Sequence, residues 1–318
     1  MKSIKYWSYI SLITLLLLIF IELFVRLCFP YIQAQGCDSK MLKDFVYGKS
    51  MGLAPNRSGI FFGKRVHIDE NRSRRNGHRF NKKKSTWLHI GDSVTMGVGV
   101  DDDSTFSALI SHETDSVNIL NPSLIGYSVV DYKNVIRQLI LNDRNALKIT
   151  HVTMFYCLND IYGQTYTEQA TPHYKILEFI KTHYRTYIAL KGLLFDRPLA
   201  IYDYDKKFYS HNGKELIQVA NEISQIQLVC QMNQIDFNIV VLPYLSQLEL
   251  KNRPTLEFNL LATALKNCNK NPPSMIDASV VFEDNDVLEN YYLFGDGIHF
   301  SNAGHHKIKE FYAAEVLK

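Results

Sequence analysis

From Ser85 to Lys318 the chain alternates short strand-like runs with longer helix-like stretches. Alternation of this kind is typical of a mainly parallel sheet that is covered by helices on both faces and joined by right-handed crossovers. The sequence therefore predicts an α/β fold with a doubly wound, flavodoxin-like sheet of five strands. The strand-like runs are residues 86–90, 117–120, 149–156, 237–242 and 278–282, and the helix-like stretches are residues 105–112, 129–141, 215–231, 256–265 and 303–317.

A nearly unbroken apolar run, residues 7–30, precedes this region. A helix of about 20 such residues spans the hydrocarbon core of a bilayer. Glu22 is the one charge deep in the run, and Arg26 is close enough to its end for the side chain to reach the interface. Two lysines precede the run, so the positive-inside rule places residues 1–6 in the cytoplasm and the rest of the chain in the periplasm or the extracellular space. We expect a transmembrane anchor.

A cleaved signal peptide is the competing interpretation of the same run. The apolar core of a signal peptide has only about 7–15 residues, which favours an uncleaved anchor. The sequence AQGC at 34–37 faintly resembles a lipoprotein cleavage site, but it lacks the usual apolar residue three places before Cys37. Both interpretations place the following domain outside the cytoplasm.

Residues 31–84 form a basic juxtamembrane segment. Within it, residues 64–84 carry nine Lys or Arg side chains against Asp69 and Glu70. Such a stretch could lie against phospholipid headgroups or an anionic polymer, although a solvated connecting segment is the plainer interpretation. Nucleic acid is a poor fit as a partner, because the stretch lies beside a membrane span and has no recognisable binding motif.

An interval at about 161–213 contains no obvious strand and is rich in tyrosine. A loop of that length inside a compact domain is usually an insertion with helices of its own, often a lid or a binding surface. The aromatic side chains could stack on sugar rings. The alternative is that they form the core between these helices and the domain.

The cysteines and histidines do not form a recognisable metal set. Five cysteines are scattered without CxxC spacing, so neither a zinc site nor a disulfide framework is expected. His305 and His306 are adjacent and would point in different directions on a helix. We expect no metal and no cofactor.

The first strand-like run is followed at once by GDSVTMG, residues 91–97. A serine at the end of a strand and between small residues can be held on a tight turn with its hydroxyl group exposed. The second glycine lies four residues after Ser93, so this is not the G-x-S-x-G elbow of α/β-hydrolases. Taken alone, Asp92 and Ser93 could equally be an ordinary helix N-cap.

GDSVTMG resembles the first conserved block of the SGNH (GDSL-type) hydrolases, and three further blocks follow in the order of that family. The resemblance covers residues 85–318, which it identifies as a hydrolase domain containing the insertion. It implies that Ser93 is the nucleophile. The remaining blocks are NPSLIGYS at 121–128, CLND at 157–160 and DGIH at 296–299.

The resemblance also assigns roles to the later blocks. It makes Gly126 and Asn159 donors of an oxyanion hole, together with the backbone N–H of Ser93, and it pairs Asp296 with His299. Two departures are visible, because Ser123 and Cys157 stand where the family often has glycine. Neither removes a group that does chemistry. Asp160 is expected to brace its loop, and Asp92 to support the nucleophile turn.

The chemistry of nucleophilic catalysis by serine requires the same groups. A serine hydroxyl is a weak nucleophile at neutral pH and needs a base within hydrogen-bond reach. His299 is the candidate base, since imidazole titrates near that pH. Asp296, three residues earlier, can accept the other imidazole N–H and stabilise the imidazolium. The negative tetrahedral oxygen then needs preorganised donors.

The sequence thus predicts a serine esterase with an acyl-Ser93 intermediate. The resemblance implies small acyl esters, including O-acetyl groups on carbohydrates, and the predicted external location suggests a surface or secreted glycan. Three alternatives stay open: O-acetyl transfer to a sugar hydroxyl, a lipid esterase or thioesterase acting at the membrane surface, and a catalytically silent glycan-binding or assembly module. The sequence does not predict an oligomeric state.

Overall fold

The computed structural model describes residues 2–162, 172–210, 213–251, 254–283 and 287–317. Five parallel strands form its central sheet in the order β6-β5-β7-β8-β9. In this order β5, the first of these strands along the chain, lies between β6 and β7. This is the order of a doubly wound flavodoxin-like sheet, so the predicted fold class is confirmed. The strands are β5 (Ser85–Ile90), β6 (Val117–Leu120), β7 (Ile149–Tyr156), β8 (Asp236–Val241) and β9 (Ser274–Asp277).

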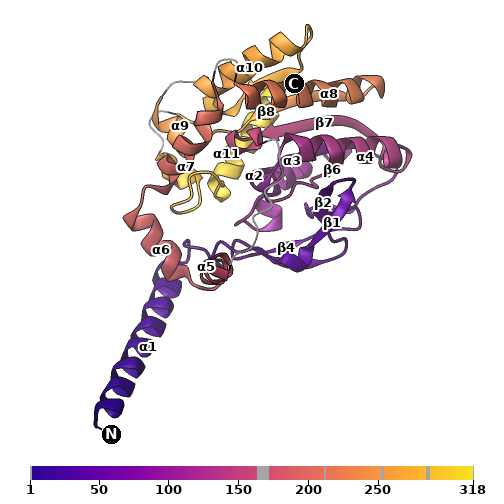
Figure 1. Ribbon diagram of the computed structural model, residues 1–318. Helices are drawn as coiled ribbons and strands as arrows, with labels where there is room; N and C mark the ends of the chain where they lie inside the picture. The colour runs from indigo at the N-terminus through magenta and orange to yellow at the C-terminus, as the bar shows by residue number, and fades with distance from the viewer. Residues whose placement is uncertain (1, 163–171, 211–212, 252–253, 284–286, 318) are drawn as a thin grey trace.

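Helices cover both faces of the sheet (Figure 1). On one face α4, α8 and α10 pack side by side, and on the other α3 packs against α11. All five were predicted from the sequence, with ends that differ by a few residues. Their bounds are α3 (Phe106–Glu113), α4 (Val129–Leu147), α8 (Lys214–Met232), α10 (Leu256–Cys268) and α11 (Asn302–Glu315).

The fifth strand was predicted at the wrong place. Residues 278–282 were expected to form it, but β9 ends at Asp277 and Ala278–Val281 is a 3-10 helix. The cause is the Asp277 side chain, which accepts the Ser279 N–H at 2.8 Å and so caps that helix. Its other oxygen accepts the Thr255 N–H at 2.9 Å. A polar cap therefore ended the strand, although the β-branched residues Val280 and Val281 follow shortly after it.

The segment after the apolar run folds onto the sheet domain. It contains two antiparallel hairpins, and Tyr47, Leu53, Phe61 and Val66 from them belong to the same hydrophobic core as the sheet. The interpretation of residues 64–84 as a solvated connecting segment is therefore wrong for Val66 and Ile68, which are buried in that core. The hairpin strands are β1 (Leu42–Tyr47), β2 (Ser50–Leu53), β3 (Ser58–Phe61) and β4 (Lys64–His67).

The basic stretch contains one cation that lies in the interior. Arg74 is 2% exposed, and its Nε donates to the Asp102 carboxylate at 2.9 Å. Its guanidinium also donates to the carbonyl groups of Met96, Gly97 and Val100. Met96 and Gly97 are the last two residues of GDSVTMG and Val100 follows shortly after, so Arg74 fixes the end of the serine turn and the loop behind it.

The insertion has helices of its own, as predicted, in the part that the structure describes. These are α5 (Pro172–His183), α6 (Arg185–Leu194) and α7 (Arg197–Asp205). Two of its tyrosines are buried: the Tyr202 hydroxyl donates to Glu257 at 2.9 Å, and that of Tyr209 donates to the Leu158 carbonyl at 2.9 Å. At these two positions the aromatic rings pack into the core. Residues 163–171 and 211–212 lie outside the described part of the chain.

The N-terminal helix α1 (Lys2–Cys28) projects away from the rest of the molecule (Figure 1). Within Tyr6–Cys28 an 18-residue stretch has a mean hydropathy of 2.5, so this helix is long and apolar enough to cross a bilayer. An N-terminal signal sequence has the same character, and the anchor and its orientation stay predictions.

We predict that Arg74→Met lowers the free energy of unfolding by about 3 kcal/mol or more, because Asp102 and three carbonyl groups lose a buried cationic partner. Chemical denaturation of the full-length protein in detergent measures the change. Arg79→Met is the matched control, since Arg79 lies in the same basic stretch and is exposed. Equal stabilities of the two variants would contradict the structural role of Arg74.

Candidate active site

Ser93 lies on a tight turn between β5 and the short helix α2 (Ser93–Met96). Gly91 is required in this turn: a Cβ atom there would lie 2.0 Å from Thr95 Oγ1 and 2.8 Å from the Phe155 carbonyl oxygen. Asp92 Oδ1 accepts the Val94 N–H at 2.8 Å and caps α2. The turn therefore holds the Ser93 hydroxyl at the carboxyl end of the sheet.

His299 lies within hydrogen-bond reach of that hydroxyl. Its Nε2 is 2.8 Å from Ser93 Oγ, and its Nδ1 is 2.7 Å from Asp296 Oδ1. The same Asp296 oxygen accepts the backbone N–H groups of Ile298 and His299. A carboxylate that accepts from Nδ1–H leaves the lone pair on Nε2, where it can accept the serine proton. The structure thus brings the three predicted residues together in the order that proton transfer needs.

The other oxygen of Asp296 contacts two residues that the sequence analysis did not single out. Arg197 Nη1 is 3.4 Å from Asp296 Oδ2, and Gln35 Nε2 donates to the same oxygen at 3.3 Å. Arg197 also donates to Gln35 Oε1 at 2.7 Å. Burial alone raises the pKa of Asp296, but His299 and Arg197 outweigh it and hold that pKa well below its usual range. No motif marks either residue, because they come from the juxtamembrane segment and the insertion.

Asp92 links the serine turn to Asn159. It is fully buried, and its Oδ2 accepts one N–H of the Asn159 amide at 3.0 Å. Ser93 Oγ lies 3.2 Å from the same oxygen, farther than from His299. A side-chain amide has two N–H bonds, so donation to Asp92 fixes the Asn159 amide and leaves a second donor.

Asn159 is held from its other side by Tyr244. The Tyr244 hydroxyl lies 3.0 Å from Asn159 Oδ1 and accepts the Asn159 backbone N–H at 3.2 Å. It also lies 2.8 Å from a carboxylate oxygen of Asp205. A flip of the amide would place its oxygen against the Asp92 carboxylate, so its nitrogen stays on the side of the serine turn.

Gly126 lies on the loop after β6, exposed and with a φ of +78° that favours glycine. A Cβ atom there would meet no neighbour within 4 Å, so the space beside it is open. Asn121 ties this loop to the serine helix, since its amide donates to the Thr95 carbonyl at 2.7 Å. The role of Gly126 as a donor stays a prediction.

Asp160 closes the loop that carries Asn159. Its carboxylate accepts the Cys157 N–H at 2.6 Å, and the residue is fully buried. Burial raises the pKa of Asp160 well above its ordinary value, and the nearby Asp92 charge raises that pKa further.

Phe62 forms a wall of the site that sequence reasoning missed. Its ring packs edge-on against His299, with 5.0 Å between the ring centroids. It sits at the turn between β3 and β4 with a φ of +45°, and its N–H donates to the Gly36 carbonyl at 2.8 Å. A left-handed backbone conformation is costly at a large aromatic residue, which indicates that the contact between Phe62 and His299 compensates for this cost. Ser93 and His299 are only 7% and 8% exposed.

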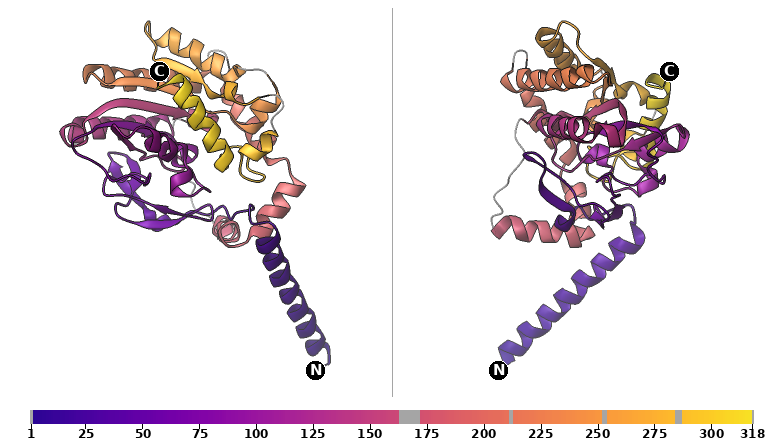
Figure 2. Two further views of the ribbon diagram at one scale, coloured as in Figure 1. Left: turned by 180° about the vertical axis from the view of Figure 1, so that it is seen from behind. Right: turned by 90° about the vertical axis from the view of Figure 1, so that its right-hand side faces the viewer.

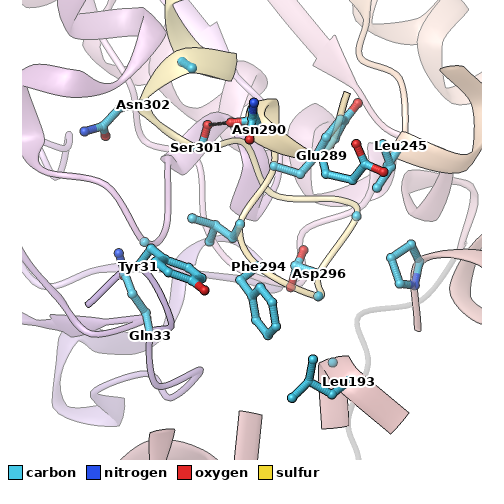
Figure 3. A pocket seen from close by; sticks show the side chains of 18 of the residues that line it. Tyr31, Gln33, Leu193, Leu245, Glu289, Asn290, Phe294, Asp296, Ser301 and Asn302 are labelled. Atoms are coloured by element: carbon cyan, nitrogen blue, oxygen red, sulfur yellow. Dashed lines mark hydrogen bonds between the residues drawn. The ribbon is translucent and has the colours of Figure 1, made fainter. Parts of the chain in front are cut away.

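A cavity of about 1020 Å³ lies beside Asp296 (Figure 3). The juxtamembrane segment contributes Tyr31, the end of α6 contributes Leu193, and the loop before His299 contributes Phe294. Ser93 and His299 do not line this cavity, so it reaches the catalytic candidates only at Asp296.

Within the described residues, no three His, Cys, Asp or Glu side chains gather as a metal site would require. The five cysteines are free thiols. The groups assembled around Ser93 are a nucleophile, a base and hydrogen-bond donors.

No protein-family model and no curated protein matches the chain. Several solved structures resemble it. TesA is 14% identical with a TM-score of 0.45, over 72% of this chain and 97% of TesA. A lipolytic protein of the G-D-S-L family from Veillonella parvula is 13% identical with a TM-score of 0.45, over 73% and 97%. A catalytic mutant of Axe2, an acetylxylan esterase from Geobacillus stearothermophilus, is 15% identical with a TM-score of 0.42, over 74% and 96%. Likeness this distant assigns neither a residue nor a substrate.

We predict that Arg197→Met lowers kcat/KM for an aryl acetate on the order of tenfold, which corresponds to about 1.4 kcal/mol. The reason is that Asp296 loses the cation that stabilises its charged form and its orientation toward His299. Lys207→Met, which removes an exposed cation from the same insertion, is the control. Equal activity of the two variants would show that Arg197 does not position Asp296.

The raised pKa of Asp160 predicts a pH-dependent stability. Between the unfolded and the folded pKa the folded state binds the additional proton, so this residue makes stability fall as pH rises, by up to about 1.4 kcal/mol per pH unit. Asp160→Asn keeps an oxygen for the Cys157 N–H and removes the titration. Denaturation of both proteins from pH 5 to 8 should give the steeper decline for the unaltered chain, and identical slopes would contradict the assignment.

Proposed function

We propose that this protein is a serine ester hydrolase that works through an acyl-Ser93 intermediate. The observation that carries the proposal is the continuous chain of contacts from Ser93 Oγ through the two His299 nitrogens to Asp296, at 2.8 and 2.7 Å. A hydroxyl, an imidazole and a buried carboxylate in this order make up the machinery of acyl transfer.

In the first step, His299 Nε2 takes the proton of Ser93 while Oγ attacks the ester carbonyl carbon. Asp296 accepts the Nδ1–H throughout and stabilises the imidazolium that forms. When the tetrahedral intermediate collapses, the carbon–oxygen bond to the alcohol breaks and His299 returns the proton to that alcohol. Water then attacks the acyl-Ser93 ester by the same path, which releases the acid and restores the serine.

The donors that we propose for the oxyanion are the Ser93 backbone N–H, the Gly126 backbone N–H and the second N–H of the Asn159 amide. The contacts of Asn159 with Asp92 and Tyr244 support this role, since they fix the amide before substrate binds. Preorganised donors of this kind contribute roughly 3–4 kcal/mol each to the stabilisation of the transition state.

We propose a small acyl group, such as acetyl, as the group transferred. Ser93 and His299 are almost buried and the Phe62 ring lies against the imidazole, which restricts the room beside the acyl carbon. The alcohol part that we propose is an extracytoplasmic glycan, on the predicted topology of α1. Acetyl transfer to a sugar hydroxyl, a membrane-lipid or thioester substrate, and a silent binding module are the alternatives that the experiments below separate.

We predict that Ser93→Ala and His299→Ala each abolish hydrolysis of short-chain aryl acetates by the full-length protein in detergent. Asp296→Asn should retain more activity than His299→Ala, because the base itself survives. A serine-reactive phosphonate should add to the unaltered protein once, at Ser93, as measured by mass spectrometry. His306→Ala, an exposed histidine on α11, is the control and should remain active.

Comparable turnover by purified Ser93→Ala or His299→Ala would end the catalytic assignment. A profile of aryl esters of increasing chain length separates a small-acyl esterase from a lipid esterase. Product analysis with an acetyl donor and an oligosaccharide separates hydrolysis from transfer. Failure of the phosphonate to react, with no turnover of any ester, would leave the silent module as the function.

A further inference from the structure

Large exposed apolar side chains gather on α5 and α6 of the insertion. Phe179 is 54% exposed, Leu193 is 73% exposed and Phe195 is 67% exposed. Large exposed apolar side chains in this number on two consecutive helices are unusual on the water-facing side of a protein and mark a contact with another apolar phase. The full set, which we call the membrane platform, is Ile176, Phe179, Leu190, Leu193, Leu194 and Phe195.

The platform is fixed to the last turns of α1. The Glu22 carboxylate accepts the backbone N–H groups of Arg185 and Thr186 at 3.1 and 3.0 Å, and the Thr186 hydroxyl at 2.7 Å. Glu22 therefore caps the N-terminus of α6, where a negative charge is favourable. Arg26 completes the junction, because its Nε binds Glu22 at 2.7 Å and its Nη2 donates to the His183 carbonyl at 2.6 Å.

Apolar packing strengthens the same junction. Val25 and Ile32 form a buried cluster with Ile188 and Ala189 of α6. The faces of α6 are thus divided: these two residues face α1, while Leu190, at 53% exposure, lies on the outer side. Leu193, at the end of the helix, borders the cavity beside Asp296. Polar capping and apolar packing together leave α6 little freedom to move relative to α1.

The length of α1 sets the depth of this junction in a membrane. The uncovered part of α1, residues 6–20, is about 23 Å long at 1.5 Å per residue. The hydrocarbon core of a bilayer is about 30 Å thick. If α1 spans it, the bilayer must extend to the turns that carry Glu22 and Arg26, and therefore to the level at which α5 and α6 are attached.

The orientation of α5 fits this depth. It lies beside the top of α1 and at the same level, along the lower edge of the domain (Figure 2). Thr182 on α5 faces Gly36, while Ile176 and Phe179 are exposed. Lys181 on α5 and Lys191 on α6 supply cations beside the apolar side chains, the composition of helices that lie in a membrane interface.

We propose that the membrane platform lies in the outer interface of the same bilayer that α1 spans. The lipid surface is the occupant because the platform continues directly from the membrane-spanning segment. The domain is then attached to the bilayer in two ways, by α1, which crosses it, and by the platform, which lies along its surface. Together they hold the domain at one height above the bilayer and in one orientation to it. The proposal depends on α1 crossing the membrane and not on the chemistry at Ser93.

The test uses the full-length protein, one chain per nanodisc, in phosphatidylcholine with or without brominated acyl chains. Leu190→Trp and Phe179→Trp place a reporter on the platform. Met232→Trp on α8 and Leu256→Trp on α10 are matched controls, since both residues are exposed apolar side chains on helices remote from α1 (Figure 1). Bromine quenches tryptophan only at short range, so quenching reports contact with acyl chains.

We predict that the quenched fraction rises above that of the unaltered protein for the two platform variants. It should fall below that value for the two controls, which add an emitter remote from lipid. The unaltered protein contains Trp7 in α1 and Trp87 in β5 of the central sheet, so its own quenched fraction reports whether Trp7 is in the bilayer. The proposal is overturned if Trp7 is not quenched, or if the platform variants are quenched no more than the controls. Platform tryptophans that are shielded from aqueous iodide but not quenched by bromine would indicate a protein partner and would also overturn it.

Discussion

The buried carboxylate of Asp296 is the interaction on which the assembly of the site depends. One oxygen holds the imidazole and the backbone of its own loop, and the other meets Arg197 and Gln35. A buried charge must be compensated, so these partners cannot be omitted without cost. Three distant parts of the chain therefore converge at one carboxylate, and the position of His299 relative to Ser93 follows from that convergence.

The sheet and the loops that carry the site were predictable because their signals are local. Strand-like runs such as 117–120 and 149–156 have the bounds that the structure gives β6 and β7. Parallel strands end at one edge, so polar residues after each strand must approach one another. The fifth strand failed because a single Asp277 side chain competed with β-branched neighbours, and propensity does not register such competition.

The contacts that were missed are all between segments far apart in sequence. In the sequence Arg74 is one of several cations in a basic stretch. Its role is visible only in the structure, where its guanidinium donates to the carbonyl groups of Met96 and Val100. Phe62, Gln35 and Arg197 likewise lack any motif, and only tertiary packing gives them a role beside His299 and Asp296. Glu22 is the opposite case, because a single charged residue inside an apolar run is expected to have a partner. Its partner, the start of α6, could not be named without coordinates.

The first forty residues form the apolar helix α1 and also supply contacts to α6 and to Asp296, which has a consequence for proteolytic processing. A peptidase that cut between Gly36 and Cys37 would remove Gln35 from Asp296 and the Glu22 cap from α6, together with the Val25 and Ile32 side chains that cover Ile188. Such a cut would thus loosen the Asp296 carboxylate and uncover the apolar surface at Ile188 at the same time. If the chain were cut there, the remaining domain would expose apolar surface that favours aggregation.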